Sequence, residues 1–90
     1  MKGLSALMMQ ALEGLKIDTL NPMQESTIEA WREGSDLILL SPTGSGKTLA
    51  YLLPLLETLK PDVQGVQAVV LVPSRELALQ IDQVFRSMNT

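Results

Sequence analysis

The feature that most restricts the fold of this chain is a glycine-rich segment placed between two apolar stretches. Residues 43–48 read Thr-Gly-Ser-Gly-Lys-Thr, after the apolar run Leu37–Leu40 and before a helical pattern over residues 47–60. A short continuous apolar run is typical of a strand buried on both faces, and the glycines permit a tight turn at its end. The sequence therefore predicts a strand, a glycine loop and a helix in that order.

The rest of the chain continues this alternation of helices and apolar runs. Amphipathic spacing predicts helices over residues 5–15 and 22–33. The run Val66–Val72 predicts a second buried strand, and Ser74 can cap a fourth helix behind it. Alternating strands and helices imply an α/β fold, with parallel strands and flanking helices in one domain.

The amino-acid content limits the chemistry that this chain can perform. It has no cysteine and no histidine, which excludes disulfides, thiolate nucleophiles, imidazole bases and Cys/His zinc sites. A bound metal would be a hard cation on oxygen ligands, with Mg²⁺ the leading candidate. The net charge of −3 lacks a broad basic surface, so a nucleic-acid contact would be local. No apolar run approaches the roughly 20 residues of a membrane span, and the N-terminus lacks a secretory signal, so we expect a cytoplasmic protein.

Residues 43–48 have the pattern of a phosphate-binding loop. Where a glycine loop enters a helix, consecutive backbone N–H groups can converge on an anion. The lysine can reach the terminal phosphates of a nucleotide and the following threonine hydroxyl can ligate Mg²⁺. The residues expected to bind the cofactor here are Thr43, Gly44, Ser45, Gly46, Lys47 and Thr48. Lys47 and Thr48 would also serve catalysis, with Thr48 as the metal ligand.

Three segments together resemble one protein family. The general phosphate-loop pattern begins with glycine, whereas this chain has Ser41, and the run Ser-Pro-Thr-Gly-Ser-Gly-Lys-Thr resembles motif I of DEAD-box RNA helicases. Residues 20–24 look like the Q motif of that family, and residues 73–78 resemble its motif Ia, with Ser74 in place of threonine. The resemblance implies part of a RecA-like P-loop NTPase domain that uses ATP and Mg²⁺ and acts on RNA.

The resemblance also implies roles for residues outside the glycine loop. Gln24 would read the edge of adenine, because a side-chain amide both donates and accepts hydrogen bonds. Pro73, Ser74 and Arg75 would contact the RNA backbone at the carboxyl end of a strand, where ligands bind in open α/β sheets. Each segment also has a simpler interpretation. Gln24 can complete a capping box with Asn21, and Ser74 can cap a helix whose first turn carries solvated charges.

The family resemblance raises the question of how much of a domain is present. The 90 residues contain no Asp-Glu-Ala-Asp or Ser-Ala-Thr motif, so we expect the N-terminal part of the first RecA-like domain, not catalytic by itself. Residues 1–34 would be the Q-motif region and residues 35–90 the P-loop and motif Ia region. The alternative is a small P-loop module that binds nucleotide or phosphate without turnover. A P-loop kinase or GTPase is disfavoured, because neither explains Gln24 and residues 73–78 together.

The two expected strands are not neighbours in the proteins that this sequence resembles. Each would then have bare backbone edges and apolar faces, and such edges recruit other strands. We therefore expect that Leu37–Leu40 and Val66–Val72 pair directly in another arrangement, or that chains self-associate.

Overall fold

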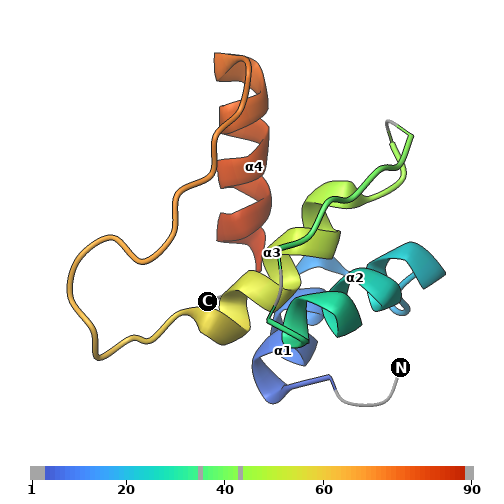
Figure 1. The fold of residues 1–90 in the computed structure, drawn as a ribbon, viewed down its shortest axis with the longest axis horizontal. Helices are drawn as coiled ribbons and strands as arrows, with labels where there is room; N and C mark the ends of the chain where they lie inside the picture. Colours follow the sequence, from blue (N-terminus) through green and yellow to red (C-terminus); the bar gives the residue numbers. More distant parts are fainter. Residues whose placement is uncertain (1–3, 35, 43, 89–90) are drawn as a thin grey trace.

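The computed structural model describes residues 4–34, 36–42 and 44–88, which form four helices joined by irregular segments (Figure 1). The helices are α1 (Ala6–Leu15), α2 (Pro22–Arg32), α3 (Lys47–Thr58) and α4 (Arg75–Ser87). Their positions confirm the four helices predicted from the sequence. Within the described ranges, no helix combines the length and apolarity that a membrane crossing requires.

Side-chain caps determine where three of these four helices begin. The hydroxyl oxygen of Ser5 accepts a hydrogen bond from the N–H of Met8 at 3.1 Å, and that of Ser74 accepts one from the N–H of Leu77 at 3.2 Å. Asn21 caps α2 in the same way. Each oxygen satisfies an N–H group that has no partner inside its helix. The caps at Ser74 and Asn21 confirm the capping interpretations of these two segments.

The core forms around α3, on which both α1 and α2 pack. Helix α3 has apolar side chains around most of its circumference, and six of its residues are buried. Helix α4 contacts α1 and has no buried residue of its own, although its C-cap Met88 is fully buried. The buried apolar cluster comprises Met8, Ala11, Leu12, Ile28, Leu49, Leu52, Leu53, Leu56 and Met88.

An ion pair joins α2 to α3 at the edge of this core. The Nε of Arg32 donates to Oε1 of Glu57 at 3.1 Å, and its Nη2 donates to Oε2 at 2.9 Å. This two-point hydrogen bond with Glu57 raises the pKa of the Arg32 guanidinium. Because both side chains are partly exposed, the pair contributes at most about 1 kcal/mol. It favours one relative position of α2 and α3 rather than supplying much stability.

The predicted parallel strands do not form in the part of the chain that the structure describes. Leu37–Leu40 and Val66–Val72 have no strand assignment, and their direct pairing is also absent. Ile38 is 85% exposed and Leu71 is 90% exposed. A strand is stabilised by its neighbours, a parallel pair has less favourable hydrogen bonds than an antiparallel one, and an isolated pair is marginal in water. The predicted α/β arrangement is therefore not confirmed. The described residues form a helical core with two unpaired apolar segments.

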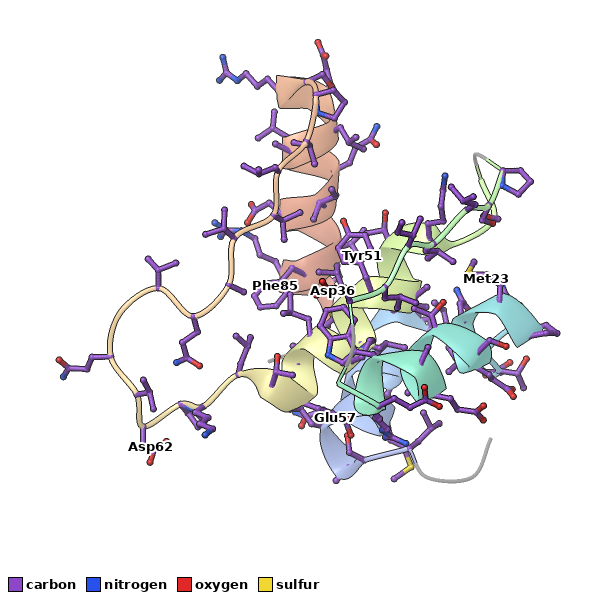
Figure 2. All side chains as sticks on the ribbon, in the orientation of Figure 1. Met23, Asp36, Tyr51, Glu57, Asp62 and Phe85 are labelled. Atoms are coloured by element: carbon purple, nitrogen blue, oxygen red, sulfur yellow. The ribbon has the colours of Figure 1, made fainter. Side chains whose placement is uncertain are left out.

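A glutamine side chain closes the loop that leads from α3 to the second of these segments. The Oε1 of Gln67 accepts from the N–H of Lys60 at 2.7 Å, and its Nε2 donates to the carbonyls of Lys60 and Val63 at 2.7 and 3.0 Å. The amide thereby pairs with both the N–H and the carbonyl of Lys60, the two groups that a neighbouring strand would otherwise bind. Figure 2 labels Asp62 in this loop, away from the helical core.

Replacing Leu53 with alanine should reduce the free energy of unfolding by about 2–5 kcal/mol, because the side chain is fully buried and its loss leaves a cavity. Leu71→Ala provides a matched control, because Leu71 is 90% exposed, and its effect should stay within about 0.5 kcal/mol. Urea denaturation followed by circular dichroism measures both variants. Equal losses of stability would contradict the location of the core.

Candidate phosphate-binding site

The glycine loop forms a tight turn immediately before α3. The N–H of Ser45 donates to the carbonyl of Pro42 at 3.3 Å, and its hydroxyl donates to the same carbonyl at 2.6 Å. The Ser45 hydroxyl also contacts that of Ser41. Gly44 and Gly46 have φ values of 82° and 89°, a region that residues with a Cβ rarely adopt. Thr43, predicted to bind the cofactor, lies outside the described residues.

The loop leads directly into the N-terminus of α3. Gly46 is the N-cap residue of this helix and has no side chain to cap it, unlike the residues that cap the other three described helices. Its carbonyl accepts the first helical hydrogen bond, from the N–H of Ala50 at 3.1 Å. The N–H groups of the first turn thus carry the partial positive charge of the helix dipole without a side-chain cap. An anion is the natural partner for such a terminus.

Two amide side chains from the start of α2 hold the carbonyls of this loop. The Nδ2 of Asn21 donates to the carbonyl of Ser45 at 3.0 Å, and the Nε2 of Gln24 donates to the carbonyl of Gly46 at 3.2 Å. A Cβ on Gly46 would lie 2.6 Å from this Nε2 atom, closer than real Cβ contacts. A side chain at position 46 would therefore displace the amide of Gln24 from the Gly46 carbonyl, in addition to being strained at this positive φ.

The same two side chains form the capping box of α2. The Oδ1 of Asn21 accepts from the N–H of Gln24 at 2.9 Å, and the Oε1 of Gln24 accepts from the N–H of Asn21 at 2.9 Å. Gln24 is only 6% exposed. Its amide thus already makes two hydrogen bonds inside the protein, one to its own helix and one to the glycine loop. The predicted capping box is confirmed, and the contact with the adenine base stays a prediction.

The predicted catalytic residues occupy the first turn of α3. Lys47 and Thr48 are half-buried there. Tyr51, which Figure 2 labels on α3, follows Thr48 by three residues. Burial raises the pKa of the Tyr51 phenol, and the nearby Thr48 hydroxyl opposes this by less. No sequence motif assigns a role to Tyr51. Its position three residues after Thr48 in a predicted helix nevertheless puts both residues on one helix face.

The donor set available for a metal is small. In the described ranges, no group of three or more Asp, Glu, His or Cys side chains lies close enough to hold an ion. Mg²⁺ commonly uses one or two protein oxygens and takes its other ligands from water and phosphate. The hydroxyl of Thr48, beside the glycine loop, therefore fits a magnesium ion that arrives with a nucleotide, but not one held by the protein alone.

The predicted RNA-contacting residues lie at a different place in the molecule. Pro73, Ser74 and Arg75 are all exposed at the start of α4, at the end of this helix that is farthest from the core (Figure 1). Ser74 caps α4, as described above. The described residues therefore bring Gln24 and the glycine loop together, but leave the motif Ia segment separate from them.

Comparison with known proteins identifies the family of this chain. A glycine loop at the start of a helix, followed by Lys-Thr, is typical of the P-loop class of proteins. Residues 21–90 match the family model of the DEAD/DEAH box helicase. The chain belongs to this family, whose domain has the RecA-like P-loop fold.

Several ATP-dependent RNA helicases are similar to this chain over most of its length. It is 46% identical to the DEAD-box ATP-dependent RNA helicase CshC of Bacillus cereus over 82 residues, and this aligned stretch is 91% of the chain. It is 43% identical over 83 residues to the ATP-dependent RNA helicase DBP8 of Mycosarcoma maydis, covering 92% of the chain. The ATP-dependent RNA helicase DHH1 of Candida glabrata is 43% identical over 69 residues, or 77% of the chain. The chain spans 21%, 16% and 14% of the lengths of these relatives.

Exchanging the two loop glycines for alanine should separate backbone strain from the contact with α2. Gly44→Ala introduces strain of about 1–2 kcal/mol, because its φ is positive but nothing lies within 4 Å of the new Cβ. Gly46→Ala adds the same strain and also displaces the amide of Gln24, so it should destabilise the fold more. Thermal unfolding measures both variants. A larger loss for Gly44→Ala would contradict the close approach of Gln24.

Proposed function

We propose that this chain is the ATP-binding part of an ATP-dependent DEAD-box RNA helicase. Residues 1–34 would supply the Q-motif region, and residues 35–90 the P-loop and motif Ia. One observation at the start of α3 carries the proposal. The helix has a glycine at its N-cap and therefore no side-chain cap, and Lys47 and Thr48 follow directly. The family match and the relatives named as ATP-dependent RNA helicases support it.

In this proposal the residues of the P-loop recognise the phosphates. The N–H groups at Gly46 and Lys47 meet the anion at the positive end of α3. The ammonium group of Lys47 adds a charge-assisted contact with the terminal phosphates. The Thr48 hydroxyl would hold Mg²⁺, which, when bound, neutralises negative charge on the phosphates during transfer. Thr43, Gly44 and Ser45 complete the expected binding loop.

The unused hydrogen-bonding capacity of Gln24 supports its proposed contact with adenine. A glutamine amide has two donor hydrogens and two acceptor lone pairs. The bonds to Asn21 and Gly46 use one of each. One donor and one acceptor remain, which is what the edge of adenine, with its amino group and ring nitrogen, can bind. Capping and adenine recognition are therefore compatible roles for one side chain.

For RNA, the proposal relies on the start of α4. Pro73, Ser74 and Arg75 are exposed, and Arg75 stands at the positively charged end of a helix whose N–H groups can meet a phosphate. ATP hydrolysis and RNA unwinding would belong to a protein of the length of the relatives. The 90 residues are expected to bind nucleotide without turnover. They contain no Asp-Glu-Ala-Asp motif, whose carboxylates would position the attacking water.

Lys47→Ala should abolish binding of a fluorescent ATP analogue to this chain, because the principal cationic contact with the phosphates is removed. Lys60→Ala removes the same charge just beyond the other end of α3 and should leave the affinity within about twofold. Fluorescence titration measures both variants. Unchanged binding by Lys47→Ala would refute the assignment of the P-loop.

Gln24→Glu should reduce the preference for ATP over GTP toward one, because the carboxylate keeps the capping oxygen but has no donor for adenine. The added negative charge weakens both nucleotides alike, so the ratio of their affinities isolates the base. Competition titration with ATP and GTP gives this ratio. A wild-type chain that binds both equally would leave Gln24 with its capping role alone.

The exposed apolar segments support a further partner, a second copy of the chain. Ile38, Leu40, Val66 and Leu71 are each more than 80% exposed, and the backbone around them has no strand partner. Such segments recruit other strands, so we expect concentration-dependent association of this chain in sedimentation velocity. Leu71→Lys should weaken it, because an inserted charge opposes strand association. A strict monomer at all concentrations would contradict this proposal.

A further inference from the structure

We propose that Asn21 is a positioning residue for phosphate recognition and acts through the carbonyl of Ser45. This inference rests on the proposed function of the P-loop and adds to it a residue that touches neither phosphate nor base. The side chain of Asn21 has two separate hydrogen bonds. Its Oδ1 accepts from the N–H of Gln24 within α2, and its Nδ2 donates to the carbonyl of Ser45, 24 residues away in the sequence.

The carbonyl that Asn21 holds shares a peptide plane with the N–H of Gly46. In a planar trans peptide the C=O and N–H bonds point in opposite directions. Drawing the Ser45 carbonyl toward α2 therefore turns the Gly46 N–H away from α2. The N–H of Gly46 does not act as a donor in the hydrogen bonds of the described residues, so it is free to meet an anion.

The neighbouring peptide is held in the same manner. The carbonyl of Gly46 accepts from Gln24 and from the N–H of Ala50, and its peptide plane carries the N–H of Lys47. Two consecutive peptides thus present their carbonyls to protein donors and their N–H groups to the opposite side. Gly46 itself offers no side chain that could hold these planes, and its glycine backbone is free to rotate. Without Asn21, the peptide between Ser45 and Gly46 loses its external hydrogen bond.

The two hydrogen bonds of Asn21 can be separated by substitution. Serine and aspartate are both good N-cap residues, so Asn21→Ser and Asn21→Asp should keep α2 capped. Serine is too short to replace the Nδ2 contact, and aspartate presents an acceptor to the Ser45 carbonyl in place of a donor. Asn21→Ala removes both hydrogen bonds and would confuse loss of the cap with loss of the loop contact.

The decisive experiment compares wild type, Asn21→Ser and Asn21→Asp by calorimetric titration with ATP and with inorganic tripolyphosphate, alongside thermal unfolding. We expect Asn21→Ser to lower the unfolding temperature by only a few degrees, no more than the loss of one hydrogen bond, and to bind both ligands about five- to tenfold more weakly. Asn21→Asp should weaken both further, because it adds repulsion between negative charges. A purely structural role would change the unfolding temperature together with the affinity.

Two results would overturn the inference. One is an affinity of Asn21→Ser for tripolyphosphate within twofold of wild type. The other is a loss seen with ATP alone, which would assign Asn21 to recognition of the base. If the wild-type chain binds neither ligand, the proposed function fails, and the ¹H–¹⁵N signal of Gly46 then decides. Increased motion of Gly46 in Asn21→Ser supports the positioning role, and an unchanged signal refutes it.

Discussion

Burial of α3 is the interaction on which the rest of the structure depends. This helix has apolar side chains on most of its faces, and both α1 and α2 pack on it. Leu53 and Pro54 lie in its fully buried part. Because the glycine loop is continuous with the first turn of α3, the place of the loop is set by the packing of the helix behind it. The packing of the core thus fixes the position of the candidate site.

The second support of the site comes from the contact between α2 and α3. The ion pair of Arg32 with Glu57 joins the C-terminal parts of these helices, whereas Asn21 and Gln24 connect the N-terminus of α2 to the loop before α3. The two helices are therefore linked at both ends, with the shared apolar surface between them. In this arrangement the start of α2 hydrogen-bonds the backbone carbonyls of the glycine loop, although more than 20 residues separate them in the sequence.

The helices and the candidate phosphate loop could be predicted from the sequence because their determinants are local. Ser5, Asn21 and Ser74 satisfy N–H groups three residues ahead of them, and the glycines of the loop stand where positive φ values occur. The strands could not be judged in this way. Apolar runs such as Val66–Val72 indicate burial, but whether a strand forms depends on partners elsewhere in the chain.

The contacts that complete the site were also beyond local reasoning. The sequence indicated that Asn21 and Gln24 could cap α2, but not that their amide nitrogens reach residues 45 and 46. Nothing in the spacing of these residues encodes that approach, which follows from how α2 lies on α3.

The weak attachment of α4 has a consequence for how the molecule opens. No residue within this helix is buried, and it is joined to α3 by a long exposed segment that crosses residues 60–71. Opening of α4 would uncover Met88 and the partly buried side chains of Ile81, Val84 and Phe85. Because α4 buries less apolar surface than α3 does, its opening costs less free energy than unfolding of the core. The contacts of α4 are with α1, whereas the glycine loop is held by α2, so the two ends of the chain are anchored on different helices. The exposed segment over residues 60–71 is the stretch between two helices that a protease reaches most easily.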